Sequence, residues 1–273
     1  MRLAEGWSVP GPATKLSLNR EGWMRNGWRR RVMGVAALAL VLACGGAGPT
    51  GVEDGVGGVL FVGNSLTYAN DLPEMVRALA LASGETLRVG MVASPDWILE
   101  DHWNGGGARA AIRGGWDVVV LQQGPSSLPE SRALLVDYTR RFADEIRAAG
   151  ATPALYAVWP SRSRFGDFDR ASESYRLAAE AVGGTLLPAG EAWRAAWRAD
   201  PDLPLYAADG LHPSVTGTYA AALVVYARLL HRSPVGAPAT LELRDGTVVR
   251  IDPTVAAVLQ TAAQATLATD GGD

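Results

Sequence analysis

The chain has 273 residues, of which 48% are apolar, and its formal net charge at pH 7 is −3. This length can bury one large core with small appendages, so we expect a single main domain. A lone cysteine excludes an intramolecular disulfide and a cysteine-based metal site. The first 43 residues carry seven basic and two acidic side chains, which leaves the remainder at −8, and an acidic domain argues against nucleic acid as a partner.

The N-terminus has the pattern of a secretory signal, which we assign to residues 1–43. Three arginines at 29–31 precede a short apolar stretch at 32–43 that is too short for a comfortable membrane span. Cys44 follows and resembles the lipidated cysteine of a bacterial lipobox, so we expect an exported, lipid-anchored protein. Simple secretion and an uncleaved anchor are the alternatives. The Gly-rich stretch 44–57 is expected to be a flexible linker.

Short apolar runs alternate with helical periodicity over residues 58–235. The runs are bounded by Gly, Pro or charged residues, as buried parallel strands are. They lie at 58–62, 87–92, 117–122, 152–158 and 184–188. The clearest helices are expected at 129–149 and 169–182, and further helices at 71–80 and 214–230. This alternation predicts an α/β fold with a doubly wound parallel sheet in one domain that spans 58–235.

The C-terminal residues 236–273 are expected to pack on that domain as an appendage. Residues 240–251 alternate around Asp-Gly, which predicts a β-hairpin, and 253–267 are expected to form a helix.

Two short motifs supply the side chains that nucleophilic hydrolysis needs. Residues 63–67 read Gly-Asn-Ser-Leu-Thr directly after the first strand, and residues 209–213 read Asp-Gly-Leu-His-Pro. A serine hydroxyl needs an imidazole to accept its proton and a carboxylate to orient the imidazole. We therefore predict Ser65 as the nucleophile, His212 as the base and Asp209 as its orienting acid. Gly63 is expected to let the backbone turn sharply.

Either motif alone has a simpler reading, as a polar turn or as a loop whose histidine caps a carbonyl. Their order around an α/β region favours the catalytic reading.

The same residues resemble a known family. Residues 63–67 are similar to the first sequence block of the SGNH (GDSL-like) hydrolases, and 209–213 to their last, the Asp-x-x-His block. This resemblance covers roughly residues 58–233. It implies a three-layer α/β/α flavodoxin-like fold, with Ser65, Asp209 and His212 in the catalytic roles above.

The two middle blocks, which supply the oxyanion hole in the family, depart from its pattern. No glycine follows the second strand, so the donor there must be the amide of Asp96 or Trp97, because Pro95 has no N–H. In the third block Gln-Gly stands where Gly-x-Asn-Asp is usual, which resembles carbohydrate acetylesterase branches. Gln123 is the first choice as a side-chain donor and Gln122 the second, and the Ser65 amide is expected to be a donor as well. The alternative is that both glutamines only cap the strand end.

Other polar and aromatic residues have weaker assignments. His102 could line the site but is better explained as a structural histidine, and His231 lies at an expected helix end. Because no His-x-x-x-His or Glu-x-x-His pattern occurs, we expect no catalytic metal and no cofactor. Trp97, Trp103 and Trp159 lie near expected loop ends, where packing is the first explanation and stacking on a sugar or acyl chain the second.

We therefore expect an exported serine esterase that acts through an acyl-enzyme on a small-molecule or glycan ester. Deacetylation of carbohydrate is the favoured reaction. A lipase, arylesterase or thioesterase would share the chemistry, and a glycan-binding lipoprotein without turnover is the alternative from another class. Contact with a membrane is expected only through a lipid anchor at Cys44.

Overall fold

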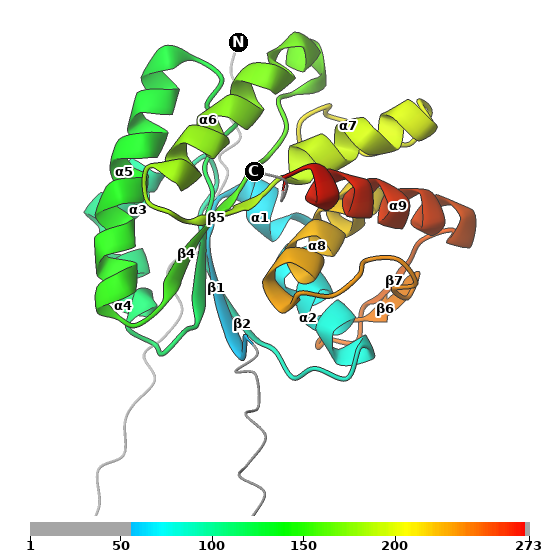
Figure 1. The fold of residues 1–273 in the computed structure, drawn as a ribbon, viewed down its shortest axis with the longest axis horizontal. Coiled ribbons are helices and arrows are strands. Elements are labelled where there is room, and N and C mark those ends of the chain that lie inside the picture. The colour runs from blue at the N-terminus through cyan, green and yellow to red at the C-terminus, as the bar shows by residue number, and fades with distance from the viewer. Residues whose placement is uncertain (1–55, 271–273) are drawn as a thin grey trace, which may run out of the picture. The chain divides into compact units, whose positions relative to one another are not determined.

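The computed structural model describes residues 56–270, which contain a five-stranded parallel sheet in the order β2-β1-β3-β4-β5 (Figure 1). The strands are β1 (Gly58–Gly63), β2 (Arg88–Ala93), β3 (Val118–Leu121), β4 (Thr152–Tyr156) and β5 (Thr185–Leu187). This strand order is that of flavodoxin-like sheets, whose switch point lies between the carboxyl ends of β1 and β3. The predicted α/β fold and all five predicted strands are confirmed.

Helices cover both faces of the sheet and make the three expected layers (Figure 1). One face carries α3 (Leu99–Gly105), α4 (Gly107–Ile112), α5 (Pro129–Ala148) and α6 (Phe168–Glu180). The other carries α2 (Leu72–Ala82), α7 (Ala189–Ala199) and α8 (Val215–Leu230). Nearly every side chain of α8 is buried, which explains why its sequence is apolar on all sides.

The structure differs from the sequence expectations mostly at short elements. β4 ends at Tyr156 instead of residue 158, and the buried residues that follow form a loop at the carboxyl edge. Helices α3, α4 and α7, together with the single-turn α1 (Ser65–Tyr68) and the 3-10 segments η1 (Ala69–Asp71) and η2 (Arg162–Asp167), were not expected. Short helices such as these are determined by packing more than by their own periodicity.

An aromatic cluster joins the core to the loops at the carboxyl edge. Trp159 is fully buried, stacks on Trp193 with ring centroids 3.5 Å apart, and donates a hydrogen bond from Nε1 to the Leu211 carbonyl at 3.1 Å. The packing explanation is therefore confirmed for Trp159. Trp103 also packs, edge-on against Phe142, whereas Trp97 remains 37% exposed.

The C-terminal hairpin and helix pack on the same compact unit (Figure 1). β6 (Thr240–Glu242) pairs antiparallel with β7 (Val248–Arg250), and the turn between them contains Gly246 at φ 87°. α9 (Pro253–Asp270) lies against α7 and α8. Both predicted elements are confirmed, and the helix extends three residues beyond the expected end.

The expected signal segment 1–43, Cys44 and nearly all of the expected linker lie outside the described residues. The exception is the end of the linker, where the Gly57 amide donates a hydrogen bond to Asp117 Oδ2 at 2.9 Å. No helix within residues 56–270 is both long and apolar enough to cross a membrane.

Candidate functional site

Ser65 lies where β1 meets α1. Asn64 is the N-cap of α1, since its side-chain oxygen accepts a hydrogen bond from the Leu66 amide at 3.1 Å. Ser65 is the first residue of the helix, so its own amide has no partner within the helix. The Ser65 side chain is therefore next to the carboxyl end of a central strand, where α/β folds bind their ligands.

Gly63 is needed for space and not for a turn. Its backbone is ordinary strand, paired in register with Ala93, and its φ is not positive. A Cβ at this position would come within 3.0 Å of both Gln122 Oε1 and Thr67 Oγ1, which is closer than real Cβ atoms come. The sequence expectation was therefore wrong about the reason for the glycine.

The buried side chain of Gln122 fastens the loop that carries Ser65. Its Oε1 accepts hydrogen bonds from the Asn64 amide at 2.9 Å and from Thr67 Oγ1 at 2.7 Å. Its Nε2 donates to Asn64 Oδ1 at 3.0 Å and to the Gln123 carbonyl. Both amide hydrogens are thus used beneath the nucleophile loop.

Gln123 points away from this loop. Its Oε1 accepts from the Leu99 amide at 3.2 Å, and its Nε2 donates to Ser126 Oγ at 2.8 Å and to the Ser131 carbonyl at 3.1 Å. A primary amide has two hydrogens, so neither Gln123 nor Gln122 has one left for an oxyanion. These bonds contradict the predicted donor role of both glutamines and fit the alternative, in which both organise the strand end.

The Asp96 backbone has the conformation that a glycine would favour. Its φ is 59°, a left-handed value that is uncommon outside glycine. The neighbouring Trp97 amide donates to the Ser94 carbonyl at 3.3 Å, which leaves the Asp96 amide as the better candidate donor of the two. Asn64 Nδ2 donates to the Trp97 carbonyl at 3.0 Å and so ties this loop to the nucleophile loop.

Asp209 and His212 form a preorganised pair in one loop. His212 Nδ1 lies 2.5 Å from Asp209 Oδ2, and the amides of Leu211 and His212 donate to Asp209 Oδ1 at 2.9 and 3.0 Å. The hydrogen bond to His212, followed by these two amides, lowers the pKa of Asp209 to about 2. The carboxylate is therefore ionised at neutral pH and orients the imidazole.

Three hydrogen bonds hold this loop at the carboxyl edge of the sheet. Trp159 Nε1 donates to the Leu211 carbonyl, and the Arg162 amide donates to the Gly210 carbonyl at 2.7 Å. Asn70, just after α1, donates from Nδ2 to the Pro213 carbonyl at 3.0 Å. Asn70 was missed in the sequence, although its left-handed backbone (φ 52°) suits asparagine.

Ser65 and the Asp209–His212 pair thus belong to segments that meet at one edge of the sheet. Among the described residues, no hydrogen bond joins Ser65 Oγ to the His212 ring. Such bonds are often long in ligand-free enzymes and shorten only when substrate binds, so the triad remains a prediction.

Comparison with known proteins identifies the family. A solved structure from Slackia heliotrinireducens, described as that of an SGNH hydrolase, is 31% identical, has a TM-score of 0.55, and aligns over 63% of this chain and 98% of its own. The chain belongs to the SGNH hydrolases. No family model matches its sequence, and no curated protein matches it.

Two more distant structures share the fold with this SGNH hydrolase. A DUF4886 family protein from Bacteroides uniformis is 20% identical, with a TM-score of 0.66, and the alignment covers 78% of this chain and 95% of that one. The lipase/acylhydrolase from Enterococcus faecalis is 16% identical, with a TM-score of 0.53 and coverage of 64% and 96%.

In this SGNH hydrolase His102 is structural, as expected. It is buried, and its Nε2 lies 2.8 Å from the Gly63 carbonyl, which can only accept, so Nε2 carries the proton. Burial lowers the pKa of His102, and the bond to Gly63 and the charge of Asp101 oppose that shift only in part. A neutral imidazole therefore supports the end of β1 directly before the nucleophile loop.

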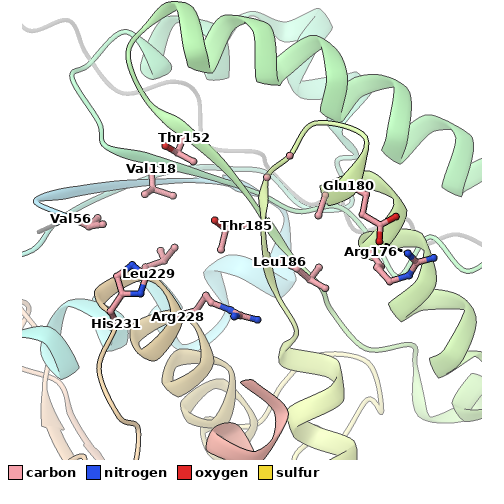
Figure 2. Close-up of a pocket in the computed structure, with 13 residues that line it drawn as sticks. Val56, Val118, Thr152, Arg176, Glu180, Thr185, Leu186, Arg228, Leu229 and His231 are labelled. Atoms are coloured by element: carbon pink, nitrogen blue, oxygen red, sulfur yellow. Dashed lines mark hydrogen bonds and ion pairs between the residues drawn. The ribbon is translucent and has the colours of Figure 1, made fainter. Parts of the chain in front are cut away.

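Two cavities lie at opposite edges of the sheet, and only one of them is on the same edge as this site. One of about 290 Å³ lies at the carboxyl edge and is lined by Gln123, Arg164 and Leu211 among others. A larger one, of about 720 Å³, is lined by Val118, Thr152 and Thr185, the first residues of β3, β4 and β5 (Figure 2). It therefore lies at the amino edge, away from the hydrolase motifs, whereas the smaller cavity lies beside the Asp-x-x-His loop.

The side chains that could ligate a metal do not cluster within the described residues. Within residues 56–270, no three His, Cys, Asp or Glu side chains form a group that could hold a metal ion. His231, which caps the end of α8 in a left-handed conformation, lines the amino-edge cavity and has no part in the candidate site.

Proposed function

We propose that this SGNH hydrolase cleaves carboxylic esters through an acyl-enzyme. The observation that carries the proposal is the short contact between His212 and Asp209, held by a loop that is hydrogen-bonded to the segments following β4 and α1. An imidazole oriented by an ionised carboxylate is the base that a serine hydroxyl requires.

The reaction has two steps that share one base. Ser65 Oγ attacks the ester carbonyl carbon while His212 Nε2 accepts the hydroxyl proton, and His212 then returns that proton to the departing alkoxide. Water next attacks the acyl-Ser65 ester, its proton goes to His212, and the carboxylic acid leaves as Ser65 regains the proton. Asp209 stays ionised and holds the imidazole in the tautomer that leaves Nε2 free to act.

The developing oxyanion is stabilised by backbone amides. The Ser65 amide, at the N-terminal end of α1, and the Asp96 amide are the two proposed donors, since both glutamine side chains are already committed. Removing a single donor in such a site typically lowers kcat by about a hundredfold to a thousandfold.

Covalent labelling tests this function directly. A fluorophosphonate probe is expected to modify Ser65, located by peptide mapping, and purified protein is expected to cleave 4-nitrophenyl acetate. The Ser65→Ala variant should lose both signals. A variant with the parent's activity, or a label on another residue, would overturn the assignment. A folded protein that binds glycans and shows neither signal would favour the non-catalytic alternative.

For the substrate we propose an acetylated carbohydrate. The support is the resemblance of the Gln-Gly block to carbohydrate acetylesterase branches and the modest size of the carboxyl-edge cavity, about 290 Å³, which suits a short acyl group. Acetylated sugars and 4-nitrophenyl esters from acetate to decanoate would be compared by kcat/KM. A maximum at acetate is expected, whereas a maximum at long chains would assign a lipase or thioesterase instead.

We further propose that the protein is exported and lipid-anchored at Cys44. The support is the basic and apolar pattern before this cysteine. Metabolic labelling with palmitate should mark the parent in a bacterial host and not Cys44→Ser. Equal labelling of both would contradict the anchor.

A further inference from the structure

The carboxyl-edge cavity combines residues from four separated segments, of which Ile98, after β2, supplies one. Gln123 and Ser127 follow β3, Pro160 and Arg164 follow β4, and Leu211 belongs to the Asp-x-x-His loop. Because Leu211 is adjacent in sequence to His212, and the Arg162 amide is bonded to the Gly210 carbonyl, one wall of the cavity is continuous with the proposed catalytic loop. The cavity thus lies beside the Asp-x-x-His loop, although neither Ser65 nor His212 lines it.

Among the described residues that line the cavity, Arg164 is the only charged one. Its guanidinium forms an ion pair with Asp167, in which Arg164 Nη2 lies 2.5 Å from Asp167 Oδ2. Arg164 Nη2 also lies 3.5 Å from Ser127 Oγ, which itself donates to Asp167 Oδ2 at 3.1 Å. The Asp167 side chain is only 9% exposed and the Arg164 side chain is 49% exposed, so the carboxylate anchors while the cation remains accessible.

The positive charge is not cancelled at this anchor. Asp167 also pairs with Arg170, so two guanidinium groups share one carboxylate and the cluster has a net charge of +1. Burial alone would raise the pKa of Asp167, but the hydrogen bonds from Ser127 and Arg164 outweigh it and the pKa is lowered, so Asp167 is ionised. Arg162, on the same 3-10 segment, is a further cation whose guanidinium lies over the Tyr206 ring, and Asp209 is committed to His212.

We propose that this cavity is an anion subsite, in which Arg164 binds a carboxylate carried by the ester substrate on its alcohol or acyl part. The inference rests on the proposed esterase function and narrows its substrate to esters of acidic molecules. A partly buried guanidinium with N–H donors left over binds carboxylates through charge-assisted hydrogen bonds, which are stronger than neutral ones.

Matched pairs of esters test the subsite and separate its two possible sources of charge. For the alcohol side, 3-acetoxybenzoate is compared with 3-acetoxybenzamide. For the acyl side, mono-4-nitrophenyl adipate is compared with 4-nitrophenyl hexanoate. In at least one of these two pairs, the parent protein is expected to have a higher kcat/KM for the anionic ester than for the neutral one. Arg164→Gln is expected to lower this anionic-to-neutral ratio of kcat/KM about tenfold or more. Arg164→Lys should retain part of the preference.

Arg170→Gln is the matched control. It removes the other cation bound to Asp167 but does not line the cavity, so it lowers the net charge of the cluster without removing the guanidinium that would contact the anion, and its ratio should fall less than that of Arg164→Gln. A parent ratio at or below one in both pairs would overturn the subsite, and so would a ratio that survives in Arg164→Gln.

A binding measurement separates this outcome from failure of the esterase proposal. In the Ser65→Ala background, 3-acetoxybenzoate and adipate monoamide are titrated by calorimetry with and without Arg164→Gln. Loss of affinity of about tenfold for one of these anions supports the subsite even if no ester is cleaved. If Ser65→Ala and the double variant Ser65→Ala/Arg164→Gln bound both anions with equal affinity, the subsite would be refuted, whatever the esterase assays show.

Discussion

His212 Nδ1 lies 2.5 Å from Asp209 Oδ2, and the same carboxylate accepts the backbone amide of His212 through its other oxygen. The acid thus orients its histidine both through the ring and through the main chain. This arrangement fits within four residues of sequence, so the pair is formed by local structure. What the rest of the fold adds is the position of the loop relative to Ser65.

Asp209→Asn should impair chemistry much more than folding. The amide would favour the wrong tautomer of His212, so we expect kcat to fall between about a hundredfold and ten-thousandfold, with KM little changed. Steady-state kinetics with 4-nitrophenyl acetate would measure this. Asp202→Asn, on an exposed turn, is the control and should match the parent. A loss below threefold in Asp209→Asn would remove Asp209 from the triad.

Gly63→Ala should disrupt the nucleophile loop. The added methyl group would displace Gln122 and break its bonds to the Asn64 amide and Thr67, so we expect the free energy of unfolding to fall by about 1–3 kcal/mol. Urea unfolding would give that value, and the rate of fluorophosphonate labelling should fall with it. Gly107→Ala adds a methyl group in open space at the start of α4 and should lower neither value. If the two variants behaved alike, the hydrogen bonds of Gln122 to the Asn64 amide and Thr67 would not contribute to the stability of the nucleophile loop.

Asp96→Gly should preserve activity, because the proposed donor is the amide and not the carboxylate. We expect kcat/KM within about twofold of the parent and a free energy of unfolding up to about 1 kcal/mol higher, since glycine relieves the left-handed backbone. Asp96→Ala keeps the backbone strain and should show no such gain. A large loss of kcat in Asp96→Gly would instead give the carboxylate a role in the reaction.

His102 should make stability depend on pH. Burial lowers its pKa in the folded protein, so below a pH of about 6.5 the unfolded chain binds a proton that the folded chain does not. The free energy of unfolding should therefore fall as the pH decreases from 7 to 5. His102→Gln can still donate to the Gly63 carbonyl but does not titrate, so its slope should be shallower by up to about 1.4 kcal/mol per pH unit.

Urea denaturation at several pH values would measure both slopes. His231→Gln, at an exposed helix end, is the control and is expected to follow the parent. Parallel slopes for the parent and His102→Gln would show that His102 takes up no extra proton on unfolding.

The sequence by itself determined the fold class and the candidate triad. Buried parallel strands are apolar runs bounded by breakers, so β1 to β5 could be located to within about two residues. Ser65 follows directly from its strand, and Asp209 and His212 are close in sequence, so local patterns were enough to select them.

The tertiary structure decided which polar groups remain available. Gln123 was the expected oxyanion donor, but its hydrogens are taken by Ser126 and Ser131, and Gln122 is committed to Asn64. Arg164 was not selected because, although its ion-pair partner Asp167 is only three residues away, the rest of the cavity wall comes from other segments of the chain. The physical reason is that a hydrogen bond or a cavity wall depends on distance in space. Gln122 and Asn64, Gln123 and the Leu99 amide, and Arg164 and Leu211 come together only on folding.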